Sequence, residues 1–324
     1  MTILKFAVGA LIVASAMQPA LAQDYPTRPI TIVVPFAAGG PIDTTTRIFA
    51  DKIKDTLGQP IIVENVGGAA GSLAAGRVAK AAPDGYTLMT GIWGTHVANG
   101  AIYRLDYDVQ KDFVPVSLVS SNPLLIVASK KVPANNLREL IDWLKANPGK
   151  ANQGTSGIGS VGHVGGVFFQ TMTGTTFNFV PYRGLAPAMQ DLTAGNIDLM
   201  FDTPATSLPQ VRSGNIKAFA VTATTRIASA PTIPTVDEAG LPGLHILTWT
   251  ALFAPKGTNP AIVARLEAAM KTALADPEVQ KRLASVGQDV YPPEMRSAAA
   301  LAKLQKDDIA KWWPIIKDAG IVVK

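Results

Sequence analysis

Short runs of β-branched residues alternate with helix-like patterns along most of this 324-residue chain. Residues 30–34 (Ile-Thr-Ile-Val-Val) predict a buried strand, and residues 43–57, closed by Gly58, predict the helix that follows it. Further strands are expected at 61–63, 86–89, 124–129, 177–181, 197–201 and 218–222, with helices at 71–81 and 137–146. Repeated strand–helix–strand units favour an α/β architecture with mostly parallel sheets.

The character of the sequence changes near Pro123 and again near Trp249. We therefore expect one discontinuous domain made of residues 23–123 and 250–324, with a second domain, 124–249, inserted into it. After about residue 260 the pattern is helical, through 267–274, 277–286 and 293–313. Two crossings of this kind place a hinge between the domains and a ligand cleft beside it.

The first residues have the three parts of an export signal. Lys5 is basic, residues 6–17 are apolar, and Ala-Leu-Ala at 20–22 resembles a cleavage site. We expect cleavage after Ala22 and a periplasmic mature protein, because an exported chain without cysteine fits the periplasm better than a disulfide-rich secreted class. The alternative is an uncleaved anchor, although the apolar run is short for a bilayer span.

The amino-acid composition further narrows the class of protein. A content of 48% hydrophobic and 16% charged residues is typical of a well-packed globular protein. The net charge of +5 is carried by scattered basic residues, which does not indicate nucleic-acid binding but suits a small anionic ligand.

Three predicted strand-to-helix junctions are rich in glycine and small residues, at 35–43, 155–163 and 181–187. Glycine allows backbone N–H groups to approach a ligand, and helix N-termini attract anions. Together the junctions predict an anion held by backbone amides from both domains. The alternative for each one is an ordinary tight turn.

The second junction contains the pattern G-x-G-x-x-G at residues 157–162, which also occurs in dinucleotide sites. Such a site needs an acidic residue about 20 positions later, and residues 151–190 contain no Asp or Glu. We therefore expect no nucleotide and no other cofactor. Arg183 is the one charged residue in that stretch, and it is expected either to face a carboxylate ligand or to form a surface salt bridge.

Four further side chains are candidates with two interpretations each. Asp43 most simply stabilises the start of its helix, with ligand contact as the alternative. Asp202 follows a predicted strand, where it would either accept a hydrogen bond from a ligand or cap the next helix. Trp93 and His96 follow another predicted strand and would either face the cleft or pack in the core.

Catalytic patterns are missing from the sequence. No G-x-S-x-G segment occurs, no cysteine is present, and the three histidines show no metal-binding spacing. We expect neither an enzyme nor a metal site.

An ordered set of motifs resembles the receptors of tripartite tricarboxylate transporters, the Bug-type periplasmic binding proteins. The motifs are Pro-Phe…Gly-Gly…Asp at 35–43, Val-Glu-Asn at 63–65, Pro-Asp-Gly-Tyr-Thr-Leu at 83–88, Ser-Gly-Ile-Gly-Ser at 156–160, Val-Pro-Tyr-Arg-Gly at 180–184 and Ala-Pro-Lys-Gly-Thr at 254–258. The resemblance covers essentially the whole mature chain.

This resemblance implies a two-domain Venus-flytrap fold, similar to type II periplasmic binding proteins, with a carboxylate in the cleft between the domains. It implies delivery of that ligand to the membrane permease subunits of a tripartite transporter by a receptor expected to be a monomer. The alternative is a co-receptor that presents the ligand to a membrane sensor kinase. The expected ligand-contacting residues, including those implied by the family's two carboxylate loops, are Phe36, Ala37, Ala38, Gly39, Gly40, Asp43, Trp93, His96, Ser156, Gly159, Ser160, Tyr182, Arg183, Gly184, Ala186 and Asp202.

The sequence departs from the family pattern at two places. Trp93 is bulky where many relatives have small polar residues, and Asn99-Gly100 stands where Asn-Pro is usual. Both are expected near the distal part of the ligand. We therefore predict that Trp93 stacks on the ligand or shortens the pocket, which would favour an aromatic or compact carboxylate. Dicarboxylic, tricarboxylic and aromatic acids all stay open as ligands.

Overall fold

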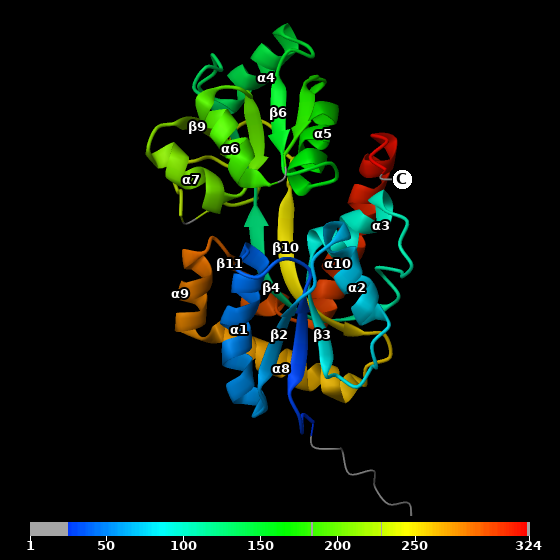
Figure 1. Cartoon of the computed structure of the whole chain (residues 1–324). Helices are drawn as coiled ribbons and strands as arrows, with labels where there is room; N and C mark the ends of the chain where they lie inside the picture. The colour runs from blue at the N-terminus through cyan, green and yellow to red at the C-terminus, as the bar shows by residue number, and fades with distance from the viewer. Residues whose placement is uncertain (1–24, 183, 228, 323–324) are drawn as a thin grey trace, which may run out of the picture.

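The computed structural model describes residues 25–182, 184–227 and 229–322, which form two lobes joined at the centre of the molecule (Figure 1). The strands are β1 Ile30–Val34, β2 Ile61–Asn65, β3 Thr87–Ile92, β4 Phe113–Pro123, β5 Leu125–Ser129, β6 Asn152–Thr155, β7 Asn178–Pro181, β8 Leu199–Asp202, β9 Ile216–Val221, β10 Leu247–Pro255 and β11 Asp289–Val290. The helices are α1 Pro41–Leu57, α2 Ser72–Ala79, α3 Asn99–Ile102, α4 Leu137–Ala146, α5 Val161–Thr173, α6 Leu185–Ala194, α7 Pro204–Arg212, α8 Pro260–Ala275, α9 Pro277–Ser285 and α10 Ala298–Asp318. Three short turns of helix complete the list, η1 Ala69–Gly71, the π-helical η2 Gly94–Ala98, and η3 Pro293–Met295.

Each lobe has its own sheet. Lobe 1 is the lobe of the six-stranded sheet β11-β4-β10-β3-β1-β2, and lobe 2 is the lobe of the five-stranded sheet β7-β6-β8-β5-β9. The chain enters lobe 2 between β4 and β5 and returns after β9, so that β10 lies between β4 and β3 of lobe 1 (Figure 1). Residues 247–249, which the sequence assigned to the second domain, thus lie in the lobe 1 sheet. The domain limits expected from the sequence stay a prediction.

The α/β class is as expected, but the expectation of mostly parallel sheets is wrong. Parallel pairing joins β1 to β2 and β3, and β6 to β7 and β8. The strands at and beside the crossings pair antiparallel, β10 with β3 and β4, β11 with β4, and β5 with β8 and β9. The chain leaves lobe 1 along β4, which continues into β5 after one residue, and comes back into the same sheet along β10. Because β10 runs in the opposite direction to β4, the two strands pair antiparallel.

Two helices begin directly beside the gap between the lobes. Helix α1 starts with Pro41 in its first turn and ends where Gly58 takes a left-handed conformation, φ 71°. Helix α5 starts after Ser160, whose hydroxyl accepts from the His163 N–H, and ends at Gly174. Because α1 follows β1 and α5 follows β6, the N-termini of both helices lie at the carboxyl ends of strands.

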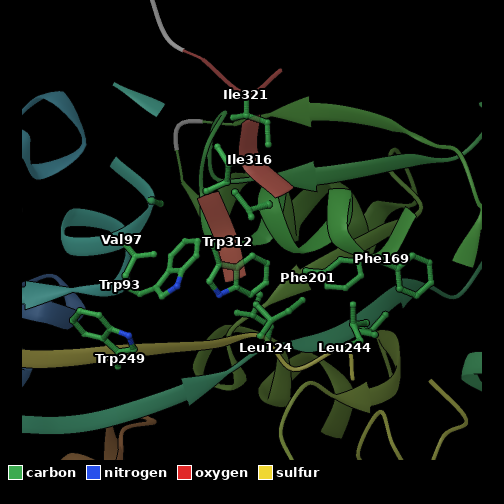
Figure 2. Close-up of a cluster of buried hydrophobic side chains, with 14 of the residues drawn as sticks. Trp93, Val97, Leu124, Phe169, Phe201, Leu244, Trp249, Trp312, Ile316 and Ile321 are labelled. Atoms are coloured by element: carbon green, nitrogen blue, oxygen red, sulfur yellow. The ribbon is translucent and has the colours of Figure 1, made fainter. Parts of the chain in front are cut away.

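One hydrophobic cluster passes through both lobes. It includes Val97 and Trp249 from lobe 1, Phe169 and Phe201 from lobe 2, and Trp312 from α10; Figure 2 draws the part around Trp93 and Trp312. Helix α10 packs against β4 and η2 in lobe 1 and reaches α5 in lobe 2. The shared core therefore couples the stability of the two lobes.

Among the helices of the described ranges, none combines the length and apolarity needed to cross a bilayer. The expected export signal and its cleavage after Ala22 lie outside the described residues.

Candidate functional site

A cavity of about 340 Å³ lies between the two lobes. Its lobe 1 wall is formed by Phe36, Ala70, Ile92, Trp93, Gly94, Asn99, Tyr103 and Thr248, and its lobe 2 wall by Ser156, Ile158, Gly159, Ser160 and Val161. The volume is at the small end of the range for ligand pockets. The structure thus brings five of the expected residues to one cavity, namely Phe36, Trp93, Ser156, Gly159 and Ser160.

Asp43 holds the loop Phe36–Gly40 in place on the lobe 1 side. Its carboxylate accepts from the Gly39 N–H (2.8 Å) and from Arg47 Nε (3.0 Å), and Asn65 Nδ2 also donates to it (3.0 Å). Burial raises the pKa of this carboxyl, but the hydrogen bonds from Arg47, Gly39 and Asn65 outweigh that effect and hold the pKa below its ordinary value. Asp43 is therefore occupied by the protein, which favours the stabilising role over ligand contact.

The loop that Asp43 holds is accessible. Ala37, Ala38 and Gly39 are exposed, while Phe36 is half-buried at the cavity wall and Gly40 sits at the start of α1. No described residue accepts a hydrogen bond from the amides of Ala37 and Ala38. These amides can donate to a ligand that reaches the edge of the cavity.

On the lobe 2 side, the loop Ser156–Ser160 is held by a contact similar to the one between Gly39 and Asp43. Gly157 and Gly159 have φ values of +117° and +78°, which glycine adopts without strain. The Gly159 N–H donates to His163 Nδ1 (3.0 Å), and the Ser160 hydroxyl accepts from the His163 N–H (3.4 Å). Ser160 and Val161, at the start of α5, line the cavity.

The N-terminus of α5 determines the charge of the lobe 2 wall of the cavity. Its first turn contains no acidic residue, whereas the first turn of α1 contains Asp43. The partial positive charge of a helix N-terminus stabilises an anion by about 0.3–2 kcal/mol. The N-terminus of α5 therefore presents a partial positive charge to the cavity that no acidic side chain of its first turn neutralises.

Strained backbone lies at the opposite wall. Ala69 and Ala70 have φ values of +47° and +52°, which cost free energy in residues with a Cβ. Asn99 Nδ2 donates to the Ala70 carbonyl (3.0 Å) and to Ser72 Oγ (3.1 Å). The amide of Asn99 is thus fixed, so its carbonyl oxygen is the group left to accept from a ligand.

Trp93 lies at the cavity but is almost fully buried, with 1% of its surface exposed. Its ring lies beside that of Trp312 (Figure 2) and packs edge-on against it, with 5.5 Å between the ring centroids. The indole Nε1 is buried without a hydrogen-bond partner among the described residues. Trp93 is therefore part of the cavity wall and has one N–H donor without a partner in the described part of the chain, while its expected role in limiting the pocket stays a prediction.

His96 is brought to the core of lobe 1 and not to the cavity lining. Its ring stacks on Phe253 (3.9 Å, 11°) and meets the edge of Phe113 at 4.7 Å. Its Nδ1 is 2.9 Å from Thr95 Oγ1. Complete burial lowers the pKa of His96 to about 3, so this location favours packing over ligand contact.

Asp202 ends β8 and is also fully buried away from the cavity lining. One carboxylate oxygen accepts from Ser207 Oγ at 2.6 Å, in the helix that follows, and the other has no partner among the described residues. Burial raises the pKa of Asp202 to about 6. The contact with Ser207 favours the local structural interpretation.

The third glycine-rich junction lies beside the second. The Tyr182 N–H donates to the Thr155 carbonyl (2.8 Å), and the Tyr182 hydroxyl donates to Asp191 (2.6 Å). Burial and the neighbouring Asp191 carboxylate raise the pKa of Tyr182 to about 12. Gly184 and Ala186 begin α6 outside the cavity lining, and Arg183 lies outside the described residues.

Several lining residues were not expected from the sequence. Ile92, Tyr103 and Thr248 belong to none of the motifs described above, whereas Ile158 and Val161 lie within the second glycine-rich junction but were not among the expected ligand contacts. Thr248 belongs to β10, far along the chain from the others. The strand pairing of β10 with β3 and β4 brings it to the cavity, and no local pattern could have indicated this.

Residues 45–321 match the model of the tripartite tricarboxylate transporter family receptor. The chain belongs to this family. Among its relatives, a protein encoded between ttuE and ttuC′ of Agrobacterium vitis is 41% identical over 302 residues, which covers 93% of this chain and 87% of the relative. The protein BugT of Bordetella pertussis is 34% identical and covers 100% of this chain and 99% of its own length.

Solved structures of the family share the fold. MatC of Rhodopseudomonas palustris with bound malate has a TM-score of 0.77 and 41% identity, covering 90% of this chain and 100% of MatC. A second R. palustris protein, with adipate, has a TM-score of 0.79 and 34% identity, covering 93% and 100%. The two-domain periplasmic-binding-protein fold and the expected family are thus confirmed. The family and its solved neighbours are periplasmic binding proteins and not enzymes.

Proposed function

We propose that this receptor captures a small organic carboxylate in the 340 Å³ cavity between its lobes. The observation that carries the proposal is the N-terminus of α5, which opens on the cavity through Ser160 and Val161 with no acidic residue in its first turn. A carboxylate placed there would accept from the amides of this turn and from the Ser156 and Ser160 hydroxyls. The amides of Ala37 and Ala38 would add donors from lobe 1.

The similar proteins support a carboxylate as the ligand, since one was solved with malate and another with adipate. We further propose that the chain is exported to the periplasm after cleavage behind Ala22 and passes its ligand to the permease subunits of a tripartite transporter as a monomer. Binding would favour the closed arrangement of the lobes only to the extent that the ligand has a higher affinity for it.

A thermal-shift screen of the chain from residue 23, refolded to remove co-purified ligand, tests the proposal. The panel contains malate, adipate, monocarboxylates, tricarboxylates and aromatic acids. A ligand at about 100 times its Kd stabilises the folded state by about 2.7 kcal/mol, and each kcal/mol raises Tm by roughly 2–4 °C in a protein of this size. A flat panel would refute carboxylate capture. Uptake of a hit by cells with and without the receptor tests the transporter link.

A further inference from the structure

The Gly159 backbone occupies a central place in the candidate site. It lines the cavity, and a Cβ built on it would lie 2.9 Å from the Ile102 side chain of lobe 1. The loop Ser156–Ser160 therefore approaches the opposite lobe at this glycine. A group that fixes the Gly159 amide therefore fixes the lobe 2 wall of the cavity and also the position of the loop next to Ile102 of lobe 1.

The group that fixes this amide is the His163 imidazole. Its Nδ1 accepts from the Gly159 N–H at 3.0 Å. A backbone N–H can only donate, so Nδ1 must be without a proton, and the histidine must be neutral. Protonation would turn Nδ1 into a second donor that faces the first, and the contact would be lost.

Lobe 1 contains a matching contact with different chemistry. Asp43 accepts from the Gly39 N–H at 2.8 Å. Asp43 and His163 are each the third residue of their helix, and each follows its glycine by four positions. The Asp43 carboxylate accepts at any pH at which it is ionised, whereas the His163 contact exists only for the neutral ring.

The surroundings of His163 favour its neutral form. The ring is mostly buried, with 8% exposure, and meets Phe179 edge-on at 4.5 Å. Burial lowers the pKa of His163 below its ordinary value. His163 also lines a groove of about 630 Å³ between α5, β6, β7 and the end of α10, and Asp318 is the one acidic or basic side chain besides His163 among the described residues that line it.

We propose that His163 is a positioning residue for ligand capture. Its neutral imidazole holds the Gly159 amide and thereby shapes the lobe 2 wall of the cavity, and its protonation releases that wall and weakens ligand binding. This rests on the proposed function, because the wall is argued to hold the carboxylate. The receptor would then bind less tightly as the periplasm becomes acidic.

Two variants separate this role from a merely structural one. In His163→Asn, the amide Oδ1 can take the place of Nδ1, as the short side chain of Asp43 does in lobe 1, and it does not titrate. His163→Leu removes the acceptor altogether. Loss of one such hydrogen bond is expected to weaken binding about two- to tenfold.

The binding experiment measures Kd for malate and adipate by calorimetry from pH 7.5 to pH 5 for the wild type and both variants. The expected result is similar affinity of wild type and His163→Asn at pH 7.5, and an advantage of His163→Asn that grows about two- to tenfold towards pH 5. His163→Leu is expected to be weaker at pH 7.5. Burial raises the pKa of Asp202, and also that of Asp308, which accepts from Trp249 Nε1, to about 6. Titration of these two carboxyls and of the ligand is common to all three proteins and cancels in the ratio of their Kd values. Parallel profiles of wild type and His163→Asn, measured down to a pH at which the wild-type histidine resonances show that His163 is protonated, would overturn the proposal.

A second measurement needs no ligand. In the wild type, the amide resonance of Gly159 is expected to shift with the titration of His163, and in His163→Asn it is expected to stay in place. A Gly159 resonance that ignores the histidine would refute the anchor itself. If instead the resonance titrates but no carboxylate binds, the proposed function fails and the anchoring of the loop stands.

Discussion

Replacement of Asp43 by alanine is expected to destabilise the protein by about 3 kcal/mol. The carboxylate accepts from the Gly39 N–H and from Asn65 Nδ2 in a buried position, with 3% of its side chain exposed. Each hydrogen bond to a charged group contributes about 1.5–3 kcal/mol. The ion pair with Arg47 adds roughly 0–1 kcal/mol, because 49% of the arginine side chain is exposed.

The loss of Asp43 should also weaken ligand binding. Without the acceptor, the loop Phe36–Gly40 loses the contact that fixes the Gly39 amide, and carboxylate affinity should fall by about two- to tenfold. The assays are urea unfolding followed by tryptophan fluorescence and calorimetric titration with malate or adipate. Since one hydrophobic cluster passes through both lobes, a single cooperative transition is expected.

The matched control is Asp51→Ala on the same helix. Asp51 pairs at the surface with Lys54 and, at 3.5 Å, with Arg282, and 55% of its side chain is exposed. Its removal should cost under about 1 kcal/mol, because exposed ion pairs contribute little. The contribution of Asp43 to the free energy of unfolding should also depend on pH. Because the folded pKa of Asp43 is lowered, its contribution is complete above the unfolded value and is lost as pH falls through that value towards the folded pKa. A cost of less than 1 kcal/mol for Asp43→Ala, or one equal to that of Asp51→Ala, would refute the reasoning.

Three further predictions concern single side chains. The pKa of His96 is about 3 in the folded protein and about 6.5 in the unfolded chain. The free energy of unfolding should therefore decrease by up to about 5 kcal/mol as pH falls from 6.5 to 3. In His96→Phe this dependence on pH, measured by urea unfolding, should become weaker, and an unchanged dependence would contradict the buried, neutral state of His96. Trp93→Ser should change the ratio of the Kd values for malate and adipate in favour of the longer acid, and an unchanged ratio would mean that Trp93 does not limit the pocket. A Cβ at Gly162 would lie 2.6 Å from the Phe201 carbonyl oxygen, so Gly162→Ala should cost about 1–3 kcal/mol in urea unfolding; a neutral effect would show that α5 can move away from β8.

Local sequence patterns predicted most elements well. The strand at 30–34 and the helix at 137–146 agree with β1 and α4. The stop at Gly58 is also as expected, since a left-handed glycine closes a helix through backbone geometry alone. At the C-terminus, the helix expected from residue 293 begins only at Ala298, after the Ser297 cap and the short turn η3.

Elements without a local signal were missed. Strand β6 has the sequence Asn-Gln-Gly-Thr, which does not resemble a strand. It forms because Gly154 lets Ile197 pack directly against its backbone and because Gln153 donates to the Gly162 carbonyl (2.7 Å). Strands β4 and β10 were also not predicted, so their antiparallel pairing with each other and with β3 was not expected either.

The sequence by itself determined the class of the fold, the positions of the glycine-rich loops and the family, because backbone freedom, helix ends and motif order are properties of neighbouring residues. It also indicated an anion as the ligand. Only the tertiary structure decided which side chains meet at the cavity. Asp43 was a candidate for ligand contact and His163 was not singled out as a site residue, yet both hold glycine loops from the third position of their helices. His96 stacks in the core because strand β10 supplies Phe253 beside it. Contacts of this kind depend on segments far apart in the chain, so no local pattern contains them.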